Sequence, residues 1–405
     1  MSRKLWPGAP ALGALGVLLL AGCGGASGSQ DGAGSDSDPI VIGIASAQTG
    51  SFTLFDVPVK NGIELAVAEY NEAGGVDGRP LEIVVSDTKS DVQLSASAAI
   101  EVLDEGADFV VTMCDYNLGA PAATEADSQG KIALACAGSA LFGPVGVGPL
   151  AYSVNESSES QGSGAAEFAA SKGWKTAYLL GDMNEDYSGS WCSSFKETFT
   201  ELNGEGAVLG EDTFVNGDTT IAPQVSALRA SGETPDVVAL CGYPPTGATA
   251  VSQLRAAGVT SPIVSTAGFD GPGWLDAVPG VSDVYAAVGA SIYGDDPSAK
   301  VNEVVSKYAA EYGDPTSAYL TFGYAMVEAI AAAVERAGST EGTEVAAALD
   351  AFDAEELILG PTTYTAGCHV ALGRDVRILE YRDGVGRYLE SLTPKKSHLP
   401  EGCTE

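Results

Sequence analysis

The sequence predicts an α/β fold in which two lobes each contain a doubly wound parallel sheet. Short apolar runs alternate with segments of helical spacing along most of the chain, a pattern typical of βαβ units. The alternation restarts after a glycine-rich loop at residues 143–148 and a short apolar run at 151–154. A chain of 405 residues also exceeds what one hydrophobic core usually supports, which favours two lobes over one.

The first lobe begins with strand 39–47 and helix 57–71, which ends before the turn at Gly74 and Gly75. Each later strand is a short apolar run, as expected for parallel strands buried on both faces, and each helix carries apolar residues at helical spacing. The remaining elements of this part are strand 81–86, helix 92–103, strand 109–113, helix 118–129, and strands 132–135 and 151–154.

The second lobe repeats this alternation, and the chain is then expected to return to the first lobe near Tyr285. The predicted elements of the second lobe are helix 158–171, strand 176–180, helix 189–202, strand 208–214, helix 221–230, strand 237–240, helix 246–257 and strand 263–265. The elements expected after the return are helices 299–312 and 319–337, followed by strands 362–365, 376–381 and 387–389. The tail beyond them is expected to be irregular.

Two predicted strands are each followed directly by a cysteine, Cys114 and Cys136. In open α/β sheets the ligand crevice lies beyond the carboxyl ends of the strands. The residues expected at its lip are therefore Asp115, Tyr116, Asn117, Gly138 and Ser139. Neighbouring strands lie about 4.8 Å apart, within the range that a disulfide tolerates. A bridge between Cys114 and Cys136 is therefore expected, with two buried thiols as the alternative.

The N-terminal segment predicts an exported chain. Residues 1–22 combine Arg3 and Lys4 with an apolar run that is too short for a confident membrane span, as in a signal peptide. The run ends in Leu-Ala-Gly before Cys23, which looks like the acylation site of a bacterial lipoprotein. Residues 23–38 would then form a flexible tether, and an ordinary cleavage site is the alternative. No later stretch is long and apolar enough to span a bilayer.

Of the seven cysteines, an even number remains once Cys23 is set aside. Because an exported chain meets an oxidising compartment, this favours disulfides over a metal site. The simplest connectivity pairs cysteines that are neighbours in the sequence: Cys114 with Cys136, Cys192 with Cys241, and Cys368 with Cys403. The other possible pairings stay open at this point.

The composition excludes several classes of function. A formal net charge of -34 argues against nucleic acid or an anionic membrane surface as a partner. Only two histidines and no Gly-x-Ser-x-Gly motif are present, so catalysis by histidine is poorly supplied. Residues 146–151 match a dinucleotide fingerprint but follow no strand, and residues 182–186 begin like a calcium loop that lacks its glycine and glutamate. We therefore expect no enzyme activity, cofactor or metal.

Several short motifs follow one another along the chain, and none of them is specific alone. They are Thr49-Gly50, Asn61-Gly62, residues 71–78 (NEAGGVDG), Cys114, Pro121-Ala122, residues 186–189 (DYSG), Tyr324-Ala325 and Gly360-Pro361. Their shared order resembles the type I periplasmic binding proteins of ABC importers, most closely the receptors for branched-chain amino acids, amides and urea. The resemblance covers nearly all of residues 39–389.

The resemblance implies that the chain crosses three times between the lobes and that the crossings form a three-strand hinge. Residues 39–152 and 290–361 would form lobe one, residues 153–289 and 362–391 lobe two, and residues 392–405 a tail. The hinge strands would lie near residues 151–154, 284–290 and 360–363.

The resemblance also implies a ligand site between the lobes. The residues expected there are Thr49, Gly50, Phe55, Asp115, Tyr116, Asn117, Ala137, Gly138, Ser139, Tyr187, Tyr243, Asp270 and Tyr324. Phe55, from the first loop, would cover the side chain of the ligand, while Tyr187 and Tyr243 would close from lobe two. Asp270 is the nearest candidate for an acid that accepts a ligand ammonium.

Asp115 departs from the pattern, because the similar amino-acid receptors have a small hydroxyl residue there. An ionised aspartate would repel a ligand carboxylate unless it points away or the ligand brings a cation. The alternative role for Asp115 is to cap the helix that begins near Leu118. For Phe55, Tyr187 and Tyr243 the alternative is ordinary packing beside the hinge.

The function implied by the resemblance is that of a lipid-anchored, extracytoplasmic receptor. It would close two lobes over a small polar ligand, such as an amino acid, an amide or a urea-like compound, and deliver it to the permease of an ABC transporter. We expect a monomer. The alternatives are a ligand sensor that signals through a membrane partner and, less favoured, an exported hydrolase.

Overall fold

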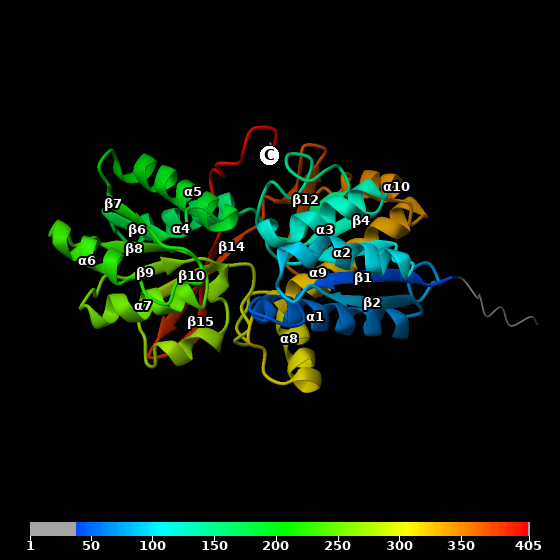
Figure 1. Ribbon diagram of the computed structural model, residues 1–405, viewed down its shortest axis with the longest axis horizontal. Helices are drawn as coiled ribbons and strands as arrows, with labels where there is room; N and C mark the ends of the chain where they lie inside the picture. The colour runs from blue at the N-terminus through cyan, green and yellow to red at the C-terminus, as the bar shows by residue number, and fades with distance from the viewer. Residues whose placement is uncertain (1–37, 404–405) are drawn as a thin grey trace, which may run out of the picture. The chain divides into compact units, whose positions relative to one another are not determined.

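The structure is a computed structural model that describes residues 38–403, and its strands form three sheets (Figure 1). The predicted signal peptide, Cys23 and the tether up to residue 37 lie outside the described residues. The first sheet is parallel throughout, in the order β2-β1-β3-β4-β5. Its strands are β1 (Ile40–Ser46), β2 (Leu81–Asp87), β3 (Phe109–Thr112), β4 (Ile132–Ala135) and β5 (Ala151–Ser153).

Helices cover both faces of the first sheet because successive strand side chains point to opposite faces. Ile42 and Ile44 of β1 belong to the core that one group of helices shares, whereas Ala45 belongs to the core on the other face. The first group is α1 (Thr53–Glu72), α8 (Ala299–Tyr312), α9 (Tyr319–Ala337) and α10 (Gly342–Leu349). The second group is α2 (Val92–Asp104) and α3 (Tyr116–Ser128).

The second sheet has the order β15-β14-β10-β9-β8-β6-β7. Its parallel strands are β6 (Ala177–Gly181), β7 (Val208–Thr213), β8 (Val237–Cys241), β9 (Ile263–Ser265) and β10 (Val284–Val288). The antiparallel strands β14 (Val376–Arg382) and β15 (Val385–Leu392) extend it. One face carries α4 (Ser158–Ser171) and α5 (Asp186–Asn203). The other carries α6 (Ala222–Ser231), α7 (Thr246–Ala256), and the 3-10 helices η1 (Ala267–Phe269) and η2 (Pro272–Ala277).

A third, antiparallel sheet packs against the first lobe. Its strands are β11 (Glu355–Leu357), β12 (Gly360–Thr365) and β13 (Cys368–Leu372). Tyr364 lies in the core of the first lobe, and its hydroxyl donates to the Ser153 carbonyl oxygen at 3.0 Å. The prediction missed α10, β11 and β13, which are short elements stabilised by tertiary packing rather than by a long periodic pattern.

Several helices start earlier than predicted. α1 begins at Thr53, so Phe55 lies in its first turn rather than in the preceding loop. The predicted helix began only at residue 57, and the earlier start leaves Pro58 inside the helix. α3 and α5 begin directly after Asp115 and Glu185, whose side chains cap them.

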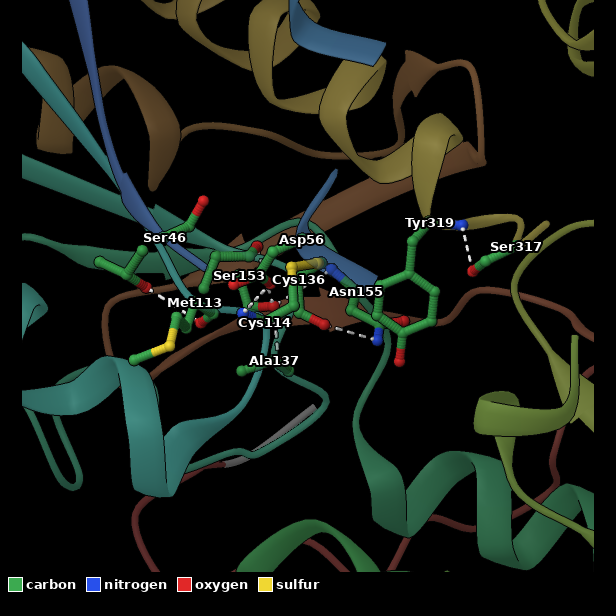
Figure 2. The surroundings of a disulfide bond; sticks show 12 residues. Ser46, Asp56, Met113, Cys114, Cys136, Ala137, Ser153, Asn155, Ser317 and Tyr319 are labelled. Atoms are coloured by element: carbon green, nitrogen blue, oxygen red, sulfur yellow. Dashed lines mark hydrogen bonds between the residues drawn. A yellow bond between two sulfur atoms is a disulfide. The ribbon is translucent and has the colours of Figure 1, made fainter. Parts of the chain in front are cut away.

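All three disulfides join the cysteines that the simplest connectivity pairs. Their Cα–Cα distances are 4.7 Å for Cys114–Cys136, 5.6 Å for Cys192–Cys241 and 4.4 Å for Cys368–Cys403. Figure 2 shows that Cys114–Cys136 lies close to Asp56 and Tyr319. The bridge therefore fixes the loops that follow β3 and β4, where the crevice was expected.

Candidate functional site

A small cavity lies at the carboxyl ends of the strands and draws its walls from both lobes. It is lined by Phe52, Phe55, Cys114, Asp115, Gly138, Tyr187, Tyr243, Gly268 and Tyr319. Its volume is about 20 Å³, which is room for about one water molecule. A larger, open cavity of about 490 Å³ lies around residues 297–300, 356–361 and 373–377, and none of the predicted ligand-binding residues lines it.

Aromatic rings form most of the cavity wall. The Phe55 ring centroid lies 4.9 Å from that of Phe52, 4.9 Å from that of Tyr319 and 5.9 Å from that of Tyr243. Tyr243 meets Phe55 edge to face, at an interplanar angle of 86°. Gly268 permits this placement, because a Cβ atom there would lie only 2.4 Å from the Tyr243 Cβ. The prediction named Phe55 and Tyr243 and missed Phe52, Tyr319 and Gly268.

Asp115 both caps a helix and lines the cavity. Its Oδ1 accepts a hydrogen bond from the Leu118 backbone N–H at 2.9 Å, which confirms the cap of α3. The side chain is buried, and this burial raises the pKa of its carboxyl well above the ordinary value. The negative charge of Glu185 raises that pKa further. A role as the cap of α3 and a place in the cavity wall are therefore compatible for Asp115.

Glu185, which the prediction missed, faces Asp115 from the second lobe. Its carboxylate accepts hydrogen bonds from the N–H groups of Tyr187 at 3.0 Å and Ser188 at 2.8 Å, and so caps α5. The Asp115 and Glu185 carboxyl groups interact with each other, and this interaction favours the protonated form of Asp115. Burial raises the pKa of Glu185 as well. No sequence signal pointed to Glu185, because the predicted helix began at residue 189 and glutamate is not among the preferred N-cap residues.

A second interlobe contact lies beside this pair. The Asp186 backbone N–H donates to Asn117 Oδ1 at 3.2 Å. Tyr116 and Asn117 line an open groove of about 370 Å³ together with Glu185 and Asp186. The predicted residues Tyr116 and Asn117 thus lie at the junction between the lobes but outside the aromatic cavity.

The Tyr187 side chain presents its ring, not its hydroxyl, to the first lobe. The hydroxyl donates to Gln161 Oε1 at 2.6 Å and accepts from the Ala267 N–H at 3.2 Å, both within the second lobe. The ring packs against Gly138, where a Cβ atom would lie 2.8 Å from it. Gly138 therefore lines the cavity as predicted, and glycine is required for this close approach.

Three of the other predicted site residues have partners outside the cavity. Thr49 Oγ1 donates to Asp87 at 2.7 Å, and the Ala137 carbonyl accepts from Ser153 at 2.7 Å. The Tyr324 hydroxyl donates to Glu69 at 2.9 Å. The residues predicted for the site that do not line the cavity are Thr49, Gly50, Tyr116, Asn117, Ala137, Ser139, Asp270 and Tyr324. Their contacts with a ligand stay predictions.

Asp270 lies behind the cavity wall rather than in it. Its Oδ2 accepts hydrogen bonds from the Ser317 hydroxyl at 3.1 Å and from the Ala318 N–H at 2.9 Å. Burial raises the pKa of this carboxyl to about 7. These contacts join η1 to the start of α9, so Asp270 connects the two lobes without lining the cavity.

Neither a metal site nor a membrane span is found in the part of the chain that the structure describes. Within residues 38–403, no group of three or more His, Cys, Asp and Glu side chains is arranged to hold a metal ion. None of the helices in the same range combines the length and the apolar character needed to cross a membrane.

Comparisons with known proteins place these features in a wider context. A family profile described as "Periplasmic binding protein" matches residues 39–385. The chain is 25% identical to Leu/Ile/Val-binding protein homolog 3 of Brucella melitensis, over 80% of this chain and 87% of that protein. It is also 25% identical to the leucine-, isoleucine-, valine-, threonine-, and alanine-binding protein of Pseudomonas aeruginosa, over 78% of this chain and 83% of that protein.

The fold is similar to that of solved structures. The branched-chain amino acid transporter substrate binding protein LivJ from Streptococcus pneumoniae, solved with isoleucine, superposes with a TM-score of 0.78 at 24% identity. The alignment covers 88% of this chain and all of that one. A leucine binding protein from Thermotoga maritima gives a TM-score of 0.76 at 24% identity, over 88% of this chain and 99% of that one. These structures confirm the predicted two-lobed α/β fold.

Proposed function

The chain belongs to the periplasmic binding protein family, and from this premise we propose that it captures one small polar solute between its two lobes outside the cytoplasm. Members of this family bind solutes, so the chain is a binding protein and not an enzyme.

The observation that carries the proposal is that both lobes line one cavity. A solute there would contact Phe55 and Asp115 of the first lobe and Tyr187 and Tyr243 of the second. Because these contacts exist together only when the lobes are closed, a solute shifts the equilibrium towards the closed form. A cavity of about 20 Å³ is too small for an amino acid, so the lobes or the aromatic side chains must separate for entry.

The hinge is proposed at the three places where the chain passes between the sheets. The first two are proposed directly after β5 and β10, close to the stretches 151–154 and 284–290 that the resemblance implies. For the third, the contacts favour residues 373–375 over the predicted 360–363. Tyr364 packs in the core of the first lobe, whereas β14 begins at Val376 in the second sheet.

The relatives support delivery to a membrane permease and an amino-acid-like solute. The Pseudomonas protein is named for the amino acids it binds, and the Streptococcus protein is described as part of a branched-chain amino acid transporter. We extend both to this chain, with the permease of an ABC transporter as its partner, and we keep the amide-like and urea-like solutes that the sequence resemblance implies. The receptor acts as a monomer.

A thermal-shift screen of the full chain tests the receptor function. Amino acids, amides, urea and small amines are added one at a time, and the true solute raises the melting temperature in proportion to the logarithm of its concentration. Tyr243→Ala, which removes one wall of the cavity, should abolish the shift. A library without any stabilising compound would contradict the proposal.

The lipid anchor is tested separately. The sequence before Cys23 motivates the variant Cys23→Ala, which should move the protein from the membrane fraction to the soluble fraction. Solute affinity should stay the same, because residues 38–403 contain the whole cavity. Finding the variant in washed membranes would contradict the anchor and leave the receptor function intact.

A further inference from the structure

The cavity wall contains a carboxyl group and no cationic side chain. The carboxyl group is that of Asp115, and none of the described residues that line the cavity is Lys, Arg or His. The charges that act most strongly on the Tyr243 hydroxyl are also carboxylates, those of Asp115, Glu185 and Asp182. A solute with a negative group would therefore enter a negative field with no cationic side chain in the wall to pair with it.

The starts of α3 and α5 offer little compensation for an anion, although helix N-termini often bind carboxylates. Here the Leu118 N–H is taken by Asp115, and those of Tyr187 and Ser188 are taken by Glu185. The protein's own carboxylates therefore occupy these three N–H groups.

The aromatic rings supply what a cation needs. Phe52, Phe55 and Tyr243 have ring centroids 4.9 to 6.2 Å apart, and Tyr319 lies on the other side of Phe55. Ring faces attract a cation that lies within about 6 Å of the centroid, and such groups of rings recognise quaternary ammonium ligands. The closed cavity of about 20 Å³ has room for about one water molecule, so the rings must separate to admit the methyl or methylene groups of such a cation.

The closeness of Asp115 and Glu185 also favours a positively charged solute. The two carboxyl groups come from different lobes, and burial together with the negative charge of Glu185 raises the pKa of Asp115 in the closed form. The closed form without solute therefore favours a proton on Asp115. A cationic solute can replace the proton, so that closure and binding stabilise each other.

Resting on the receptor function proposed above, we propose that the solute is a compact organic cation without a carboxylate, held by Asp115 and by the aromatic rings of the cavity. Within the receptor function, amines and quaternary ammonium compounds take the place of the amino-acid-like, amide-like or urea-like solute, and zwitterionic amino acids are excluded.

Two matched pairs of probes test the proposal by titration calorimetry on the full chain. Choline is compared with dimethylbutanol, its uncharged carbon isostere, and isoamylamine is compared with leucine, which adds only a carboxylate. The member that carries a positive charge and no carboxylate should bind at least tenfold more tightly in each pair. Equal or reversed affinities in either pair would overturn the proposal.

Variants then assign the effect to Asp115. Asp115→Asn removes the charge but keeps the cap of α3, because asparagine caps a helix about as well as aspartate. It should lower the affinity for the cationic probes at least tenfold. The matched control is Asp91→Asn, which changes the N-cap aspartate of α2 outside the cavity and should leave the affinity unchanged. Equal affinity of wild type and Asp115→Asn would overturn the role of Asp115.

The outcomes also separate this inference from the receptor function. Saturable binding of leucine with one site per chain, and none of the cationic probes, would overturn the cationic solute while supporting the receptor. No saturable binding in either pair would count against the inference, and the thermal-shift screen then decides the fate of the receptor function. The melting temperature of Asp115→Asn is compared with that of the wild type. A similar value would show that the variant is folded and that a loss of affinity comes from the site.

Discussion

Asp56 and Asp115 both carry buried carboxyl groups in the first lobe, but the partners of these carboxyl groups come from different parts of the molecule. Asp56 accepts hydrogen bonds from the N–H groups of Ala47 at 2.8 Å and Cys114 at 3.1 Å, all within one lobe (Figure 2). Asp115 accepts from one N–H of its own lobe, and its other partner is Glu185 of the second lobe. The environment of Asp56 is therefore fixed by folding, whereas that of Asp115 depends on how the lobes meet.

The largest expected effect is on stability at Asp56. Asp56→Ala leaves two buried N–H groups without an acceptor, and each costs roughly 1 to 3 kcal/mol. Chemical unfolding should show a loss of about 4 kcal/mol. Solute affinity measured on the folded fraction should change little, because Asp56 does not line the cavity. A loss below about 1 kcal/mol would contradict the structural role of Asp56.

The pH dependence of stability tests the same carboxyl. Burial raises the pKa of Asp56 from 3.8 to about 7 in the folded protein. Since the folded state then holds its proton more tightly than the unfolded state, this contribution is present below pH 3.8 and is lost as the pH rises to about 7. Relative to Asp56→Asn, wild type should therefore lose stability over this range. Parallel pH profiles would contradict the raised pKa.

The difference between the two aspartates also shows what the sequence could predict. The strand and helix order follows from alternation alone, and the pairing of Cys114 with Cys136 follows from strands that end side by side. The partner of Asp115 could not be predicted in this way. Glu185 lies far from it in the sequence, and only the approach of the two lobes brings them together. Likewise, Tyr319 joins Phe55 through the packing of α1 against α9, whereas Phe52 meets Phe55 within the start of α1 itself.

Asp115→Ser separates the cap from the site. Serine caps a helix about as well as aspartate, so the free energy of unfolding should change by less than about 0.5 kcal/mol. The affinity for the solute should fall by about 2 kcal/mol, the scale for losing a charge-assisted hydrogen bond. Calorimetry and unfolding on the same preparation measure both quantities. Unchanged affinity would mean that Asp115 only caps α3 and, like Asp56, has a purely structural role.

The smallest effect is expected at Tyr187. Tyr187→Phe removes a hydroxyl whose partners, Gln161 and Ala267, both belong to the second lobe. The variant should lose about 1 kcal/mol of stability and keep its affinity for the solute, because the ring stays in the wall. A large loss of affinity would show that the hydroxyl contacts the solute directly.

NMR of the aspartate carboxyl carbons, with choline as the solute, tests the central claim most directly. The Asp115 signal should move from the protonated towards the ionised position when choline is added at constant pH, and the Asp56 signal should stay where it is. Assignments come from Asp115→Asn and Asp56→Asn. An Asp115 signal that does not respond to choline, or an Asp56 signal that moves equally, would contradict the distinction between the two carboxyl groups.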